Sequence, residues 1–169
     1  QRHRLEYEVR HDWLTGLLNQ QGFEELLREQ VTNAASQGAS LSLMLLDLDG
    51  FRPYNDRYGR PAGDEVLRRV AMELDRQCSG AQSICARTGG EEFALLWPGL
   101  APETARELAE QARASICKLG IINEAMLRGA MLSASAGLAG LQLDDDDTDP
   151  KRLSARLQRD AEEAFVAGE

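Results

Sequence analysis

A short, nearly continuous apolar run, residues 41–48, limits the possible folds of this chain and ends in two aspartates, Asp47 and Asp49. A nearly continuous apolar run of this length is typical of a strand that is buried on both faces. Segments with helical periodicity lie on either side of it. Strands that alternate with helices, together with one hairpin, favour a layered α/β (α+β) domain with a mixed central sheet flanked by helices.

Apolar periodicity and turn residues predict the remaining elements. The predicted helices cover residues 19–38, 61–78, 102–119 and 149–165. The other predicted strands cover residues 83–87, 91–97, 121–122 and 131–141. Gly89 and Gly90 separate two of these strands, and glycine readily takes the positive φ that a tight hairpin requires.

The chain of 169 residues has the length of one domain. Residues 1–12 are charged with scattered apolar positions, which suits the end of a connecting helix, and we expect residues 13–169 to form the domain. The longest apolar run is too short to span a membrane, so we expect no membrane contact by this fragment. Because the sequence begins at Gln1, we interpret it as part of a longer protein with further domains upstream.

The net charge of −9 argues against a nucleic-acid polymer as partner, since such a partner favours a basic surface. It does not argue against a nucleotide, because metal ions can bridge carboxylates to phosphates. The three cysteines share no metal-ligand spacing, and both histidines lie in the N-terminal arm. A zinc site is therefore not expected.

Two loops carry the residues with the greatest chemical interest. Asp47 and Asp49 follow the buried strand, and Gly89-Gly90 is followed at once by Glu91 and Glu92. Carboxylates that converge at one edge of a sheet repel each other unless a cation or proton lies between them, and Mg²⁺ suits such hard oxygen ligands. The glycines leave room for backbone to approach phosphates, which together suggests phosphoryl or nucleotidyl transfer. Each loop considered alone is also consistent with an ordinary turn.

Several ordered motifs resemble the GGDEF family, from the N-terminal arm to the final helix. The sequence Gly89-Gly90-Glu91-Glu92-Phe93 is similar to the GGEEF form of the family signature. The other matching segments are residues 12–19, 47–52, 55–59, 63–64 and 133–137. The resemblance implies a ferredoxin-like, palm-type nucleotide-cyclase fold with GGEEF on a β-hairpin. It implies the activity of a diguanylate cyclase, which joins two GTP molecules into cyclic di-GMP.

The resemblance also implies a metal site for Mg²⁺ or Mn²⁺. Asp47 would bind the metal through its carboxylate and Leu48 through its backbone carbonyl. Glu91 would be a further metal ligand and the group that helps to activate the ribose 3′-hydroxyl, and Glu92 is a candidate ligand beside it.

The substrate contacts are carried over in the same way. Asn55 and Asp64 would hydrogen-bond the guanine edge and thereby select GTP over ATP. Phe51 and Arg52 would lie near the phosphates, and Arg52 would act in catalysis by stabilising developing charge. Gly89, Gly90 and Arg60 complete the expected substrate-binding set.

In this family each domain holds one GTP, so turnover needs a homodimer, and a cytoplasmic location with an upstream sensory domain is expected. The sequence departs from the family at Arg52, where Lys is usual, at Arg60, where His is usual, and at Glu169, near the usual position of a phosphate-binding Lys and Arg. Either the chain ends before that basic pair or this member has lost it. These departures leave an alternative, a catalytically weak or inactive module that binds GTP or cyclic di-GMP and regulates a neighbouring domain.

Overall fold

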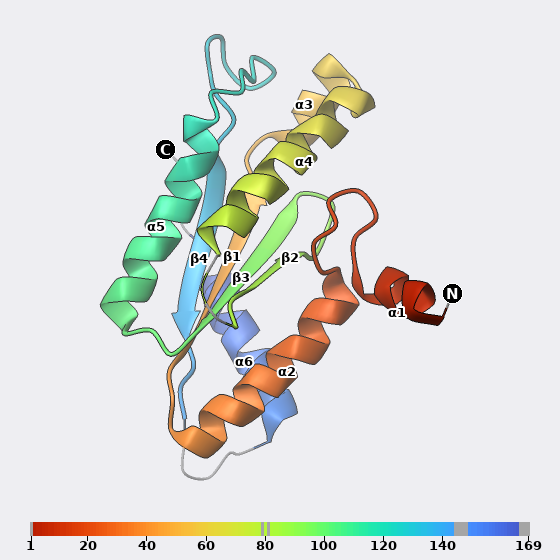
Figure 1. Cartoon of the computed structure of the whole chain (residues 1–169). Coiled ribbons are helices and arrows are strands. Elements are labelled where there is room, and N and C mark those ends of the chain that lie inside the picture. Colours follow the sequence, from red (N-terminus) through yellow and green to blue (C-terminus); the bar gives the residue numbers. More distant parts are fainter. Residues whose placement is uncertain (1, 79, 81, 144–148, 166–169) are drawn as a thin grey trace.

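The computed structural model describes residues 2–78, 80, 82–143 and 149–165 (Figure 1). Its helices and strands follow in the order α1 (Arg2–Arg10), α2 (Gln20–Gln37), β1 (Leu41–Leu48), α3 (Phe51–Tyr58), α4 (Arg60–Gln77), β2 (Ile84–Arg87), β3 (Glu92–Pro98), α5 (Pro102–Lys118), β4 (Ala134–Gly140) and α6 (Pro150–Glu163). In these residues no helix is both long enough and apolar enough to cross a lipid bilayer.

The four strands form one sheet in the order β2-β3-β1-β4, and each neighbouring pair is antiparallel. The layered α+β class is confirmed, but the sheet is antiparallel rather than mixed. The physical reason is the hairpin: β1 and β2 run in the same direction, yet β3 folds back from β2 and fills the position between them. The two strands joined through α3 and α4, β1 and β2, are parallel in direction, but they are not neighbours in the sheet.

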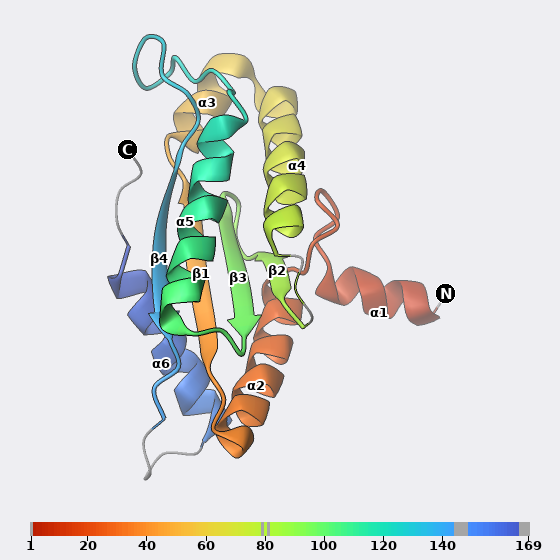
Figure 2. The same ribbon diagram turned by 60° about the vertical axis from the view of Figure 1, so that its left-hand side comes forward.

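Helices cover both faces of the sheet (Figures 1 and 2). The helices α4 and α5 pack on one face, where Met44 and Leu46 of β1 enter a core with Val70 of α4. The helices α2 and α6 pack on the other face, where Leu41 and Leu43 enter a second core. Alternate residues of β1 thus point into two cores, and the prediction of a strand buried on both faces is confirmed.

Several helix ends follow the local signals in the sequence. The side chain of Asn19 accepts a hydrogen bond from the Gly22 amide at the start of α2, and Gly38 ends that helix in the left-handed conformation with φ 61°. The side chain of Asp149 accepts from the Lys151 amide at the start of α6. These predicted helix boundaries are confirmed.

Two segments differ from the predicted elements. Residues 51–58, for which the sequence pattern predicts no helix, form the helix α3, because Pro53 is tolerated within a first turn and Phe51 and Tyr54 share one buried side. The predicted strand at 121–122 is only a single bridge between Ile122 and Met131. The strand predicted at 131–141 is shorter, since β4 covers Ala134–Gly140.

Candidate active site

The carboxyl end of β1 and the β2–β3 hairpin lie side by side at one end of the sheet. Asp47 pairs in register with Glu92, and the amide of Leu48 donates to the carbonyl oxygen of Glu91 at 3.1 Å. The two loops that the sequence singled out are therefore neighbours in space. Backbone hydrogen bonds, rather than side-chain contacts alone, fix their relative position.

Asp47 carries a buried oxygen with no partner. Its Oδ1 atom is inaccessible to solvent and accepts no hydrogen bond from the described residues. Burial, followed by the charges of Glu91, Glu92 and Asp49, raises the pKa of Asp47 to about 6. Burying a carboxylate without a partner is unfavourable, so this group calls for a cation or a proton.

Asp49 has a different environment, although it lies only two residues away. Its two carboxylate oxygens accept hydrogen bonds from the Ser133 hydroxyl at 2.7 Å and the Ser135 hydroxyl at 2.6 Å. Its backbone amide also donates to the carbonyl oxygen of Ser133. Asp49 thus fastens the end of β1 to β4, while Asp47 keeps an unpaired oxygen.

Arg87 holds the glycine bend of the hairpin. Its guanidinium donates from Nε and Nη2 to the carbonyl oxygen of Gly90, at 3.1 and 2.8 Å, and from Nη1 to both oxygens of Asp12 at 3.1 Å. Both side chains of this ion pair are largely buried. Burial alone would raise the pKa of Asp12, but hydrogen bonds from Thr15 and Arg87, with the charge of Arg87, lower it.

A cavity of about 320 Å³ opens between the hairpin and the helices α3 and α4, and we call it the α3–α4 cavity. Its walls contain both charged groups and apolar groups. The lining residues are Phe51, Arg52, Asn55, Arg60, Asp64, Leu67, Arg87, Gly90 and Glu91. Most of the residues predicted to bind the nucleotide therefore share one cavity, although they come from three separate segments of the chain.

Asn55 presents a second unpaired oxygen in this region. Its Oδ1 atom is buried and accepts no hydrogen bond from the described residues. The side-chain amide occupies the space that a Cβ atom would need at Gly63, so a larger residue at that position of α4 would displace Asn55. A buried amide oxygen without a donor is costly, and a hydrogen-bonding ligand would satisfy it.

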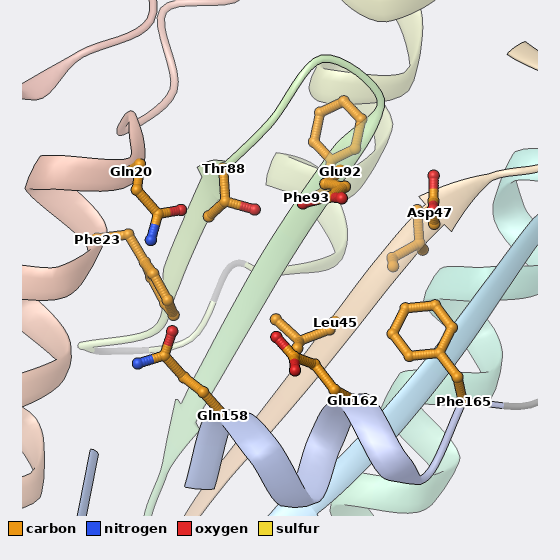
Figure 3. A pocket seen from close by; sticks show the side chains of 11 residues that line it. Gln20, Phe23, Leu45, Asp47, Thr88, Glu92, Phe93, Gln158, Glu162 and Phe165 are labelled. Atoms are coloured by element: carbon orange, nitrogen blue, oxygen red, sulfur yellow. The ribbon is translucent and has the colours of Figure 1, made fainter. Parts of the chain in front are cut away.

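A second cavity, of about 460 Å³, lies between the sheet and the helices α2 and α6, and we call it the sheet–α6 cavity (Figure 3). Asp47 and Glu92 enter it from the end of the sheet, and Gln158 and Glu162 enter it from α6. Its other lining residues are Gln20, Phe23, Leu45, Leu46, Thr88, Phe93 and Phe165. The charged side chains of this cavity are all acidic.

The candidate metal ligands are divided between the two cavities. Asp47 and Glu92 line the sheet–α6 cavity, whereas Glu91 lines the α3–α4 cavity. Glu91 nevertheless interacts electrostatically with Asp47, because the charge of Glu91 raises the pKa of Asp47 more than any other charge does. Within the described ranges no three acidic, histidine or cysteine side chains already form a metal-binding group.

The residues at this edge fit a hard divalent cation. The unpaired Oδ1 of Asp47, with Glu91 and Glu92 beside it, supplies the carboxylate oxygens that Mg²⁺ or Mn²⁺ prefers. Leu48 is buried, and its carbonyl belongs to the same end of β1. Because Mg²⁺ is commonly held by one or two carboxylates together with substrate phosphates, a complete protein cage is not required.

Three supporting features were not assigned a role from the sequence. They are the Asp12–Arg87 ion pair, the Asp49 contacts with Ser133 and Ser135, and the close fit of Gly63 against Asn55. Apart from Arg87, these residues lie in the matching motifs, but pairing over such sequence distances cannot be read from spacing. Gly89 lies outside both linings and packs against the side chain of Glu92. Glu169, where the basic pair was expected, lies outside the described residues.

Comparison with known proteins gives concordant results. Residues 9–167 match the family described as "Diguanylate cyclase, GGDEF domain". The chain is 39% identical over 117 residues to the diguanylate cyclase DgcM of Escherichia coli, a match that covers 69% of this chain and 28% of DgcM. It is 38% identical over 120 residues to the cyclic di-GMP phosphodiesterase PdeB of Shewanella oneidensis, covering 71% of this chain and 13% of PdeB.

A solved structure supports the same relationship. The active GGEEF domain of a diguanylate cyclase from Vibrio cholerae superposes with a TM-score of 0.74 at 28% sequence identity, and the match covers 88% of each chain. The chain spans only a small part of the curated relatives that it matches. Because the family match extends over nearly the whole sequence, the chain belongs to the diguanylate cyclase GGDEF-domain family.

Proposed function

We propose that this domain is a diguanylate cyclase that condenses two GTP molecules into cyclic di-GMP and two pyrophosphates across a domain dimer. One observation carries the proposal: the α3–α4 cavity gathers Asn55, Arg52 and Glu91, and the charge of Glu91 acts on Asp47, whose Oδ1 has no partner among the described residues. A nucleotide base, a phosphate chain and a divalent cation are the chemical groups that this combination suits.

Recognition of the base is assigned to Asn55 and Asp64. The Oδ1 of Asn55 packs against Gly63, and once turned toward the cavity it would accept from an amino or imino group of guanine. The half-buried carboxylate of Asp64 is a second acceptor in the same cavity. Adenine presents a different donor pattern on that edge. A site built around buried acceptors rejects a base that leaves them unpaired.

Catalysis is assigned to Glu91 of the hairpin and to Arg52 of α3. Glu91 would assist removal of the proton from the ribose 3′-hydroxyl, whose oxygen then forms a bond with the α-phosphorus of the other GTP. The bond between that phosphorus and the bridging oxygen to the β-phosphate breaks, and pyrophosphate leaves. Arg52, exposed at the cavity, would stabilise the charge on the phosphates.

Asp47 and Glu91, with Glu92 and the carbonyl of Leu48, would hold the Mg²⁺ or Mn²⁺ ion. A cation held there supplies charge neutralisation for the triphosphate. The protein residues provide its position, and Gly90 leaves the cavity rim free of a side chain. A cytoplasmic location, where GTP is abundant, and an upstream sensory domain that controls dimer formation complete the proposal.

The test is product formation from GTP. Protein, with and without a fused dimerising segment, is incubated with GTP and Mg²⁺ or Mn²⁺, and cyclic di-GMP is measured by chromatography. We expect product from the wild type and a loss of at least about a thousandfold in Glu91→Gln. Glu65→Gln, at an exposed carboxylate on α4, is the matched control and retains activity. Absence of product even in the fused dimer contradicts the proposal.

A second candidate function is a regulatory module that binds GTP or cyclic di-GMP without turnover. It is favoured by the division of Asp47 and Glu91 between two cavities and by the match to PdeB, a protein named as a phosphodiesterase. Calorimetric binding of GTP, without product at any protein concentration, would support this function in place of the first.

A further inference from the structure

The segment between α5 and β4, residues 121–133, projects at the same end of the sheet as α3 and the hairpin, and we call it the tip loop (Figures 1 and 2). Ile122 and Met131 bridge its two arms in antiparallel fashion. The amide of Asn123 also donates to the carbonyl oxygen of Ala130 at 2.8 Å. The loop is therefore a hydrogen-bonded structure.

The tip loop is fastened to the turn between β1 and α3. The side chain of Asn123 is buried, and its Nδ2 donates to the carbonyl oxygen of Gly50 at 3.2 Å. The hydroxyl of Tyr58 accepts from the amide of Glu124 at 3.0 Å. The side chain of Met126 fills the space where a Cβ atom at Gly50 would lie. This turn connects the candidate metal ligands to Arg52, so the loop contacts the backbone of the site itself.

Apolar side chains gather on the outside of this loop. Ile122, Met126, Leu127 and Met131 have exposed fractions of 48%, 58%, 72% and 54%. Single exposed apolar residues are ordinary, but a group of large ones within one short segment marks an interaction surface. About half or more of each side chain therefore remains open to solvent among the described residues.

The charge of the tip loop fits a second copy of this chain. The whole chain has a net charge of −9, so two copies repel each other over most of their surfaces. The tip loop carries one acidic and one basic side chain, Glu124 and Arg128, and is therefore neutral. In a two-fold arrangement the Glu124 of one copy can lie opposite the Arg128 of the other, because such an interface is self-complementary.

We propose that the apolar surface of the tip loop docks against the same surface of a second copy and holds the two domains together while each carries a nucleotide. This inference rests on the proposed function, which requires two domains to meet. Contact between tip loops would restrict the Gly50 turn, because Asn123 and Met126 of the tip loop contact Gly50. Because Arg52 follows Gly50 by two residues, dimer formation would thereby affect the position of Arg52.

The experiment measures association without turnover. Sedimentation velocity is followed at increasing protein concentration with Mg²⁺ and saturating 3′-deoxy-GTP, which lacks the attacking hydroxyl. We expect the wild type to dimerise and Leu127→Glu to need at least about tenfold more protein for the same dimer fraction. Met72→Glu is the matched control, because Met72 is 75% exposed on α4 and the change in charge is the same.

Nucleotide binding by the monomer separates this proposal from the proposed function. Calorimetric affinity for 3′-deoxy-GTP at low protein concentration should be unchanged in Leu127→Glu. Equal dimerisation of Leu127→Glu and the wild type overturns the inference, as does equal weakening by Met72→Glu. A wild type that dimerises through the tip loop but makes no cyclic di-GMP supports the inference and refutes the proposed activity.

Discussion

The two cavities at the end of the sheet differ in charge although they share the same hairpin as a wall. The α3–α4 cavity contains Arg52, Arg60 and Arg87 together with two carboxylates, whereas the charged side chains of the sheet–α6 cavity are Asp47, Glu92 and Glu162. A cavity with fixed cations and hydrogen-bond acceptors suits an anionic nucleotide. A cavity with only carboxylates repels phosphate unless a metal ion lies between them.

The contrast in charge matches the two roles proposed for the residues around the hairpin. The proposed nucleotide contacts Asn55 and Asp64 lie on the consecutive helices α3 and α4. The proposed cation ligand Asp47, with its unpaired oxygen, lies at the carboxyl end of β1. The hairpin borders both cavities, because Glu91 lines one and Glu92 lines the other.

The largest effect is expected from Asp47→Asn. Removing this carboxylate should lower cyclic di-GMP formation at least about a thousandfold, because the metal loses its main ligand. The melting temperature of the metal-free variant at pH 8 should rise, because a carboxylate penalised by burial and by Glu91 is gone. Glu162→Gln, in the same cavity, should change turnover less than about threefold. A Glu162→Gln loss as large as that of Asp47→Asn would contradict the division of roles.

Arg87→Ala should lower the free energy of unfolding by about 3 kcal/mol, because it leaves Asp12 charged and largely buried without its partner. The carbonyl of Gly90 loses both of its guanidinium donors as well. Urea denaturation at pH 7 measures the change. Arg4→Ala, which breaks the exposed Arg4–Glu8 pair, is the control and should have no measurable effect. Similar values for the two variants would show that the hairpin does not depend on this ion pair.

Gly63→Ala should raise KM for GTP by at least about tenfold with a smaller change in kcat, because a methyl group displaces the side-chain amide of Asn55. Steady-state kinetics of cyclic di-GMP formation test this expectation. Gly140→Ala is the matched control, since a Cβ atom at Gly140 meets no other atom within 4 Å. If both variants keep the wild-type KM, Asn55 does not contribute to binding in the orientation described.

The smallest expected effect is on the pH dependence of stabilisation by Mg²⁺. The pKa of Asp47 is raised from an ordinary 3.8 to about 6 in the folded state. In the metal-free protein, protonated Asp47 does not destabilise the fold below about pH 4. The free energy of unfolding then decreases as pH rises from about 4 through about 6, because Asp47 must ionise in its buried position. Mg²⁺ binds the ionised form, so the increase in melting temperature on adding Mg²⁺ should be larger at pH 7.5 than at pH 5. An increase that does not depend on pH, or one that persists in Asp47→Asn, would place the ion elsewhere.

The arrangement of the elements could be predicted in large part from local signals. The apolar run of β1, the caps Asn19, Gly38 and Asp149, and the Gly89-Gly90 bend each act over a few residues. The helix α3 was not predicted, because an eight-residue segment with Pro53 near its start has too little periodicity to distinguish it from a loop. Local signals also could not predict whether the sheet is mixed or antiparallel, since that depends on which strand lies beside β1.

The family, the two carboxylate-bearing loops and the residue types in them could be read from the amino-acid sequence. The cavity that each carboxylate lines follows from the folded arrangement of the strands. Glu91 and Glu92 are adjacent in the chain, but Glu91 lies in the bend before β3 and lines the α3–α4 cavity with Asn55 and Asp64. Glu92 is the first residue of β3, and the register with β1 pairs it with Asp47. That register is set by packing of the two cores against both faces of the sheet, which no short motif encodes.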